Sequence, residues 1–235
     1  MKYWNAIARP ALTAAAVALV AGCAALEPVE NTENNDAGMA PGNLPIVCSN
    51  NVTPEQRVEL DAIDDLMVQS ENYAALARLE TLSFSTQQHW LRWAELMAKV
   101  EQIEQSEDAF EQIVATCGSA EAYHGLGVVY LKTNRVQQGL DALQKAKTLN
   151  PASAPVRNDF GIALMRTGLY GQAAFELRTA YELSGKQQNV GRSMVAAYYL
   201  HGGEQILSRL QRETGVNDQV VEAGVEFSRQ FVKGS

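Results

Sequence analysis

The strongest constraint on this chain is a repeat, in which apolar and small residues recur at an offset of 34 positions between residues 120 and 187. The matching pairs are Leu126 and Phe160, Gly127 and Gly161, Tyr130 and Leu164, Gly139 and Ala173, Leu143 and Leu177, and Ala146 and Ala180. A unit of this length cannot bury its apolar face alone, so neighbouring units must stack. The repeat therefore predicts similar modules at residues 120–153 and 154–187.

Helical spacing of apolar residues fills these modules and extends beyond them. From residue 53 onward apolar positions recur three or four residues apart, and the period-two alternation of half-buried strands is absent. The string Thr53-Pro54-Glu55 is typical of a helix start, because it offers a capping hydroxyl, an early proline and a carboxylate. We therefore expect further helix pairs at 54–69 with 72–83 and around Trp90 and Trp93, and a capping helix at 218–233.

Small and large apolar residues are distributed in a way that suits crossed helices. Gly127, Gly139 and Ala146 would lie where two helices cross closely, and larger side chains such as Tyr123 and Leu143 would fill the space between hairpins. With its 34-residue period, this pattern resembles the tetratricopeptide repeat (TPR), a helix–turn–helix unit. The resemblance implies an all-α fold, a right-handed superhelical solenoid of tetratricopeptide-like helix hairpins over residues 53–235.

The N-terminus has the pattern of an export signal, because Lys2 and Arg9 precede a mostly apolar, uncharged run at residues 11–21. The run is shorter than the roughly 20 residues that a membrane span needs. It ends in Val20-Ala21-Gly22-Cys23, which resembles a bacterial lipobox and implies removal of residues 1–22 and acylation of Cys23. Two or three acyl chains anchor a protein firmly to a membrane. An ordinary secretory signal with a chance cysteine is the alternative.

An acidic segment follows the lipid site. It carries Glu27, Glu30, Glu33 and Asp36, no basic residue and no hydrophobic period. We therefore expect residues 23–52 to form a flexible tether between the membrane and the helical domain. Ala24, rather than Asp, follows the lipid site, and by resemblance to Gram-negative lipoproteins this implies the outer membrane, with the domain facing the periplasm.

The cysteine usage fits an exported protein. With Cys23 acylated, Cys48 and Cys117 remain as an even pair in an oxidising compartment. A disulfide between them would close a loop of about 70 residues and stabilise the fold by about 4 kcal/mol in the chain-entropy model. The alternative is that Cys117 is a small buried residue at a helix end. A catalytic cysteine is disfavoured, because neither thiol has a CxxC partner or a nearby histidine.

The composition excludes several classes of function. Nineteen basic and 27 acidic residues give a net charge of -8, without the surplus of Lys and Arg that phosphate binding needs, so we expect no nucleic-acid partner. Three Cys and three His are too few and too scattered for a zinc module, and P-loop, GxSxG and HExxH motifs are absent. We therefore expect no enzymatic activity, no metal and no cofactor beyond the lipid on Cys23.

Stacked TPR hairpins turn their first helices toward a groove. The resemblance assigns groove positions to His124, Val128, Leu131 and Lys132, to Asn158, Ile162, Met165 and Arg166, and to Ala197, Leu200 and His201. This aliphatic strip with a basic edge predicts a protein partner, bound as an amphipathic helix or an extended peptide whose carboxylate the edge attracts. The alternatives are that part of the strip packs against the tether or the terminal helix, and that His124 is simply solvated or hydrogen-bonded.

One longer stretch carries a closer resemblance. Residues 156–164 (VRNDFGIAL) and 174–180 (AFELRTA) are similar to the TadD lipoproteins of tight-adherence (Flp) pilus assembly. The resemblance implies an accessory or pilotin-like factor for the outer-membrane secretin or for another pilus-assembly component. The alternatives are the TPR pilotin of type IV pili, which usually has more regular repeats, and a general periplasmic scaffold for envelope enzymes.

Overall fold

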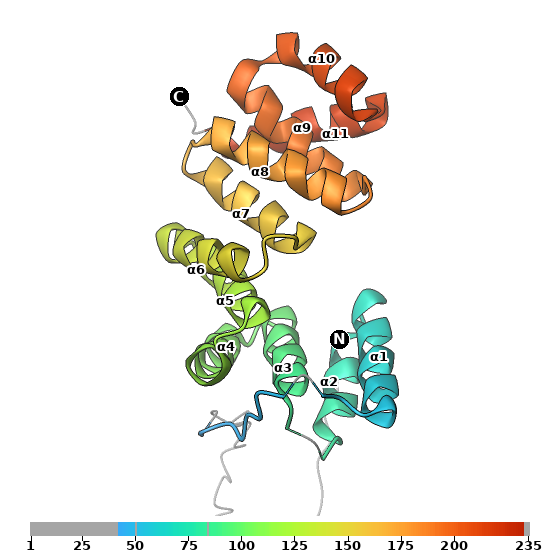
Figure 1. The fold of residues 1–235 in the computed structure, drawn as a ribbon, viewed down its shortest axis with the longest axis vertical. Helices are drawn as coiled ribbons and strands as arrows, with labels where there is room; N and C mark the ends of the chain where they lie inside the picture. Colours follow the sequence, from blue (N-terminus) through green and yellow to red (C-terminus); the bar gives the residue numbers. More distant parts are fainter. Residues whose placement is uncertain (1–41, 50, 84, 233–235) are drawn as a thin grey trace, which may run out of the picture. The chain divides into compact units, whose positions relative to one another are not determined.

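A computed structural model describes residues 42–49, 51–83 and 85–232 (Figure 1). All of them belong to the unit Met39–Ser235, whereas the predicted export signal at residues 1–22 and the predicted lipid site Cys23 lie outside the described residues. The helices of the described residues are α1 (Pro54–Val68), α2 (Asn72–Glu80), α3 (Gln87–Lys99), α4 (Ile103–Cys117), α5 (Ala120–Lys132), α6 (Val136–Leu149), α7 (Ala154–Arg166), α8 (Tyr170–Leu183), α9 (Gln188–Gly202), α10 (Glu204–Thr214), α11 (Asp218–Ser228) and the 3-10 helix η1 (Arg229–Phe231). Consecutive helices pack as hairpins, and α5–α6 and α7–α8 fall within the two expected modules.

The two helices of a hairpin begin in different ways. The first helices α1, α3, α5 and α7 start behind a hydroxyl that accepts a backbone N–H, provided by Thr53, Thr86, Ser119 and Ser153. The second helices α2, α4, α6 and α8 have no such cap and follow tight turns with a left-handed residue, with φ of 63° at Ser70, 65° at Glu101, 61° at Asn134 and 80° at Gly168. The caps and turns together therefore set the hairpin boundaries.

Glycine sets how closely the helices of the central hairpins approach each other. A Cβ atom at Gly127 would lie 2.7 Å from Leu143 Cγ, and one at Gly161 would lie 2.5 Å from Leu177 Cγ. Because carbon atoms do not pack at such distances, a side chain here would push α5 away from α6 and α7 away from α8. This close approach explains why small residues recur at the 34-residue offset.

Two apolar clusters hold the hairpins together. The first extends from residue 44 to 130 and fully buries Ile63, Leu79, Leu96 and Ile113. The second extends from residue 131 to 231 and buries Leu143, Leu177, Met194 and Leu210. The boundary falls inside α5, and we call the two parts the N-terminal half and the C-terminal half.

A buried ionic network joins three helices of the C-terminal half. Glu176 of α8 is only 7% exposed, and its carboxylate pairs with Lys147 of α6 at 2.7 Å and with Arg157 of α7. The Lys147 ammonium also lies 4.4 Å from the centre of the Phe160 ring. Arg157 further donates to the carbonyl oxygen of Pro151 at 2.7 Å. These contacts tie α6, α7 and α8 together.

Residues 44–49, which we call the strap, lie against the N-terminal half. Val47 forms a parallel β-bridge with Thr86, in which Val47 N donates to Ser85 O at 2.9 Å and Gln87 N donates to Val47 O at 2.9 Å. Leu44 N donates to Gln112 Oε1 of α4 at 2.8 Å. The strap was expected to belong to the flexible tether at residues 23–52, but these backbone hydrogen bonds instead fix it to the helical domain.

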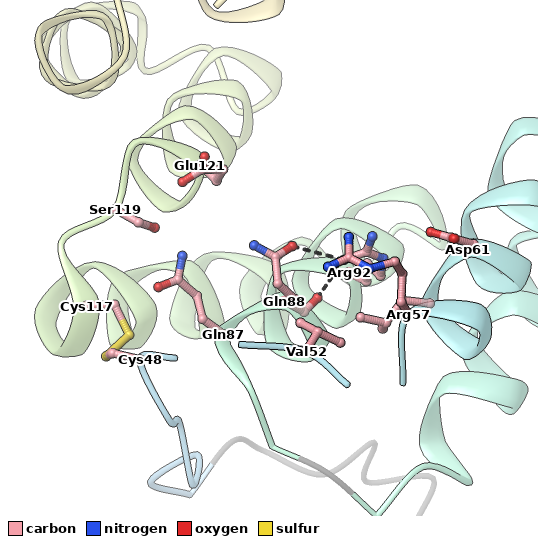
Figure 2. A pocket seen from close by; sticks show the side chains of 11 residues that line it. Cys48, Val52, Arg57, Asp61, Gln87, Gln88, Arg92, Cys117, Ser119 and Glu121 are labelled. Carbon is pink, nitrogen blue, oxygen red and sulfur yellow. Dashed lines mark hydrogen bonds between the residues drawn. A yellow bond between two sulfur atoms is a disulfide. The ribbon is translucent and has the colours of Figure 1, made fainter. Parts of the chain in front are cut away.

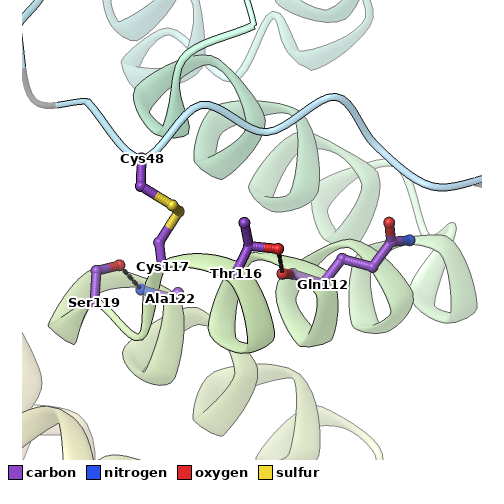
Figure 3. Close-up of a disulfide and its surroundings, with 6 residues drawn as sticks. All are labelled: Cys48, Gln112, Thr116, Cys117, Ser119 and Ala122. Carbon is purple, nitrogen blue, oxygen red and sulfur yellow. Dashed lines mark hydrogen bonds between the residues drawn. A yellow bond between two sulfur atoms is a disulfide. The ribbon is translucent and has the colours of Figure 1, made fainter.

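A disulfide completes the attachment of the strap (Figure 3). Cys48 is joined to Cys117, the last residue of α4, with Cα atoms 5.3 Å apart and a sequence separation of 69. Directly after this residue, Gly118 adopts a left-handed φ of 59° and Ser119 caps α5. The covalent link therefore connects the strap to the junction between the second and third hairpins.

The C-terminal end departs in detail from the expected helix at 218–233. The helix α11 packs on α9, and a Cβ atom at Gly224 would lie 2.5 Å from Val195 Cβ. It ends at Ser228, whose hydroxyl donates to the carbonyl oxygen of Val225 at 2.6 Å. This local bond occupies an acceptor of the last turn, and the chain continues as the 3-10 helix η1.

Candidate protein-interaction groove

Two adjoining pockets lie along the first helices of the N-terminal half. The polar pocket has a volume of about 480 Å³ and is lined by Cys48, Val52, Arg57, Leu60, Asp61, Gln87, Gln88, Arg92, Cys117, Ser119 and Glu121. The apolar pocket has a volume of about 450 Å³ and is lined by Asp64, Gln88, Leu91, Arg92, Glu95, Ala98, Phe110, Glu121, His124, Gly125, Val128, Val129 and Asp159. Three residues line both, so the pockets form one depression, which we call the groove.

Arg92 lies where the two pockets meet (Figure 2). Its Nε donates to Asp64 Oδ1 at 2.8 Å and its Nη2 donates to Asp64 Oδ2 at 2.6 Å, a forked pairing that ties α3 to α1. Its Nη1 donates to Gln88 Oε1 at 3.1 Å. All three guanidinium nitrogens therefore have partners within the protein, and the group forms part of the groove wall.

The floor of the apolar pocket comes from α3, α4 and α5. Leu91 and Ala98 lie on α3, Phe110 on α4 and Val128 on α5, where Val128 is 39% exposed. A Cβ atom at Gly125 would lie 2.1 Å from Phe110 Cε1, so the missing side chain lets the ring lie directly against α5. This floor is half-buried at Leu91 and Ala98 and exposed at Val128, and such a surface suits apolar side chains of a ligand.

His124 lines the groove, as expected, but it is engaged by the next hairpin. Its Nε2 is hydrogen-bonded to Asp159 Oδ2 at 2.7 Å, which joins α5 to α7. Asn158 also contacts this carboxylate, because its Nδ2 donates to Asp159 Oδ1 at 3.1 Å. Asn158 therefore orients Asp159 and does not itself line the groove.

A neutral histidine lies buried beside the groove. His89 on α3 is 5% exposed, and its ring lies edge-on to Trp90 with centroids 4.9 Å apart. Burial, and next the nearby charge of Arg92, lowers the pKa of His89 from 6.5 to about 4. Trp90 and Trp93 pack with the N-terminal apolar cluster, which makes them core residues.

The helix α3, to which the sequence analysis assigned no groove residue, supplies more lining residues than any other helix. Its residues Gln88, Leu91, Glu95 and Ala98 all line the apolar pocket. They are the groove positions of α5 moved back by 33 residues. The same positional rule, applied one hairpin earlier at this offset, would have found them. Asp61 and Asp64 of α1 extend the wall further.

Part of the aliphatic strip expected to bind a partner is buried instead. Leu131 is 8% exposed, Met165 is 1% exposed and Ala197 is fully buried. Leu131 packs on α6, where a Cβ atom at Gly139 would lie 2.8 Å from its Cδ2. Ile162 and Leu200 are half-buried against the C-terminal apolar cluster. Leu131, Met165 and Ala197 are therefore core residues, whereas Ile162 and Leu200 keep part of their surface exposed.

The expected basic edge is also used within the fold. Lys132 Nζ donates to Ala98 O at 2.6 Å and pairs with Glu101 at 3.0 Å. Arg166 Nη1 donates to Leu131 O at 2.7 Å. Each cation thus lies at the C-terminal end of the preceding hairpin's first helix, where the helix dipole favours positive charge. His201 lies against Gly171 of α8, outside both pockets.

The described part of the chain holds no metal-binding cluster of side chains and no membrane-spanning helix. Within residues 42–49, 51–83 and 85–232, no three His, Cys, Asp or Glu side chains are grouped closely enough to hold a metal ion. None of the helices in these ranges combines the length and apolar character needed to cross a bilayer. What the groove does offer is shape, an apolar floor and charged walls, which are properties of a binding surface.

Comparison with known sequences finds a relative that is described as containing TPR repeats. No protein-family model matches the chain. The chain is 28% identical over 215 residues to the TPR repeat-containing protein PA4299 of Pseudomonas aeruginosa, in an alignment that covers 91% of this chain and 82% of the relative.

Solved structures of TPR proteins have the same fold. TTC0263, a thermophilic TPR protein of Thermus thermophilus, is 17% identical with a TM-score of 0.59, over 74% of this chain and 98% of that chain. YrrB, described as a TPR protein with an unusual peptide-binding site, is 18% identical with a TM-score of 0.50, over 72% of this chain and 90% of that chain. The chain therefore has the fold of TPR proteins, and the expected all-α solenoid of helix hairpins is confirmed. Such stacks are typical scaffolds for protein–protein interaction.

Proposed function

We propose that this protein binds a segment of another polypeptide in the groove. The observation that carries this proposal is the continuity of the polar and apolar pockets across α1, α3 and α5. An elongated depression with an aliphatic floor and polar walls suits an extended peptide, whose backbone and alternate side chains need both kinds of surface. The description of YrrB as peptide-binding supports this class of ligand.

Within this proposal, the chain is an outer-membrane lipoprotein that acts as an accessory, pilotin-like factor in Flp (Tad) pilus assembly. Its partner is the secretin or another component of that assembly. The similarity of residues 156–164 and 174–180 to TadD lipoproteins supports the pilus role. The lipobox-like string that ends at Cys23 supports the lipid anchor, which would present the groove to periplasmic segments of the partner.

The groove is tested by placing a charge on its floor. Val128→Glu should reduce capture of purified secretin fragments by at least about tenfold, because it buries a carboxylate against the partner's apolar side chains. Val58→Glu is the matched control, since Val58 is 65% exposed on α1 and lines neither pocket. Equal capture by both variants would place the interface outside the groove.

The anchor and the pilus role are tested in cells. Cys23→Ser should move the protein out of the outer-membrane fraction, and deletion of its gene should reduce heat-resistant secretin multimers. Normal multimers in the deletion strain would remove the pilotin role. In that case, loss of a different partner from Val128→Glu pull-downs would identify a type IV pilus component or an envelope enzyme as the client instead.

A further inference from the structure

The lining of the apolar pocket is strongly acidic. It includes four carboxylates and a single guanidinium, namely Asp64, Glu95, Glu121, Asp159 and Arg92. This is the reverse of the basic edge expected from the sequence. Because charged walls around an apolar floor exclude like charges and attract opposite ones, this composition bears directly on what the groove can hold.

Two of these carboxylates are already engaged within the fold. Asp64 is paired with Arg92, and Asp159 is hydrogen-bonded to His124 and Asn158. The other two carboxylates remain available to a ligand. Glu121 forms no ion pair or hydrogen bond with any residue in the described ranges, and Glu95 has only a 3.6 Å pairing with Lys99 one turn along its own helix. The pocket thus has two carboxylates to offer beside Leu91 and Val128.

The side chain of Gln87 in the polar pocket is a second observation, independent of the carboxylates, that indicates a ligand. Gln87 is only 4% exposed, yet no hydrogen bond joins its side-chain amide to any residue that the structure describes. Figure 2 shows this amide extending from α3 toward the side of the pocket where Ser119 and Glu121 lie. The amide atoms themselves keep some exposure to the pocket, so a group that both donates and accepts is open to a ligand there. A peptide bond of a bound segment supplies the matching acceptor and donor.

We propose that the groove selects basic segments: an extended stretch of a partner polypeptide that carries Lys or Arg beside aliphatic residues. Its backbone pairs with the Gln87 amide in the polar pocket. Its aliphatic side chains lie on Leu91 and Val128, and its cationic group pairs with Glu121 and Glu95. This inference rests on the proposed function, because it specifies the chemistry of the same groove.

The apolar pocket disfavours an acidic segment, because among the described residues it offers no free cation to pair with a carboxylate of that segment. Arg92 is engaged by Asp64, and Lys132 and Arg166 are bonded to helix ends outside both pockets. The remaining cation of the lining, Arg57, lies in the polar pocket, one turn before Asp61 on α1. It can hold a single carbonyl or carboxylate group, but it does not offset the acidic wall of the apolar pocket.

The inference is tested with a random 12-residue peptide library displayed on phage and selected on the intact protein. We expect the selected peptides to be enriched in Lys and Arg beside Leu, Ile or Val. The affinity of a selected peptide should fall about tenfold in Glu121→Gln and about tenfold in Gln87→Met, and it should weaken with added salt. Glu226→Gln on α11 is the matched control, because Glu226 pairs only with the nearby Arg229. Circular dichroism of each variant verifies that the helices are intact.

The outcomes separate this inference from the proposed function. Selected peptides that lose affinity on Val128→Glu but show no preference for basic residues, or that are insensitive to Glu121→Gln, overturn the basic-segment inference and leave peptide binding in the groove intact. Selected peptides that bind Val128→Glu unchanged overturn both proposals. A library that yields no peptide above background also overturns the inference.

Discussion

The two halves of this chain use the same helix hairpin but present its first helix differently. In the N-terminal half, Glu95 of α3 and Val128 of α5 are exposed and line the groove. In the C-terminal half, the equivalent Ile162 of α7 is half-buried, and Ala197 of α9 is fully buried. The repeat therefore fixes where a side chain lies along the stack, whereas the size of neighbouring side chains decides whether a partner can reach it.

The halves also differ in what holds them together. The strap and its disulfide cross the N-terminal half, so part of its stability comes from a covalent restraint on the unfolded chain. The C-terminal half instead has the buried network of Glu176, Lys147 and Arg157.

The largest expected effect separates buried from exposed positions of the same repeat. Met165→Glu should lower the free energy of unfolding by more than about 5 kcal/mol, because it removes core packing and buries a carboxylate. Val128→Glu should change it by less than about 1 kcal/mol. Urea unfolding followed by circular dichroism measures both. Similar losses in the two variants would contradict the difference in burial between these two positions.

Removing the disulfide should act on one half. Replacing both Cys48 and Cys117 by Ala should lower the free energy of unfolding by about 4 kcal/mol in the chain-entropy model. Hydrogen exchange should speed up in α1 to α4 and stay unchanged in α7 to α9. Cys23→Ala is the control, since it leaves the pair intact. Uniformly faster exchange along the whole chain would show that the halves do not differ in this respect.

The buried network should matter most in the other half. Glu176→Gln leaves Lys147 and Arg157 without their counter-charge, and it should lower the free energy of unfolding by about 3 kcal/mol. Glu213→Gln on α10 breaks two ion pairs near the surface, and its effect should be much smaller. Thermal unfolding of the two variants measures the difference. Equal shifts in melting temperature would show that the buried ion pairs of Glu176 stabilise the fold no more than the ion pairs of Glu213 near the surface.

The smallest expected effect is a pH dependence that originates in the N-terminal half. Because the pKa of His89 falls from 6.5 to about 4 on folding, the unfolded chain binds the extra proton between these values. The contribution of neutral His89 to the free energy of unfolding is complete above pH 6.5 and is lost as the pH falls. At pH 5 this free energy is lower by about 2 kcal/mol. Urea unfolding of His89→Gln should show a flatter profile over this window, whereas His201→Gln should keep the original slope.

The stack itself was predictable because packing at close helix crossings leaves a direct trace in the sequence. Gly127 and Gly161 recur because larger residues would collide with Leu143 and Leu177. A search for a 34-residue period therefore detects them. The caps at Thr53 and Ser153 also mark helix starts through their own chemistry. The fold therefore follows from residues whose type is fixed by local geometry.

The groove was only partly predictable, since position along a helix does not determine exposure. His124 and Val128 line the groove, whereas Leu131 and Met165, which were also expected to face a partner, are buried by α6 and the C-terminal cluster. The hydrogen bonds of the strap left no signal, because its β-bridge uses backbone groups that every residue except proline has, and the sequence indicated its attachment through the Cys48 and Cys117 pair. Its attachment depends on tertiary contacts that periodicity does not report.

The link between Cys48 and Cys117 changes how mechanical load passes through the molecule. Tension applied ahead of residue 48 and behind residue 117 runs through the sulfur atoms, and the 69-residue span between them is bypassed. The walls of the groove that α1 and α3 provide lie inside that span. Tension along the chain would therefore be carried by α5 and the hairpins beyond it. The two walls of the groove would carry no tension and would keep their shape.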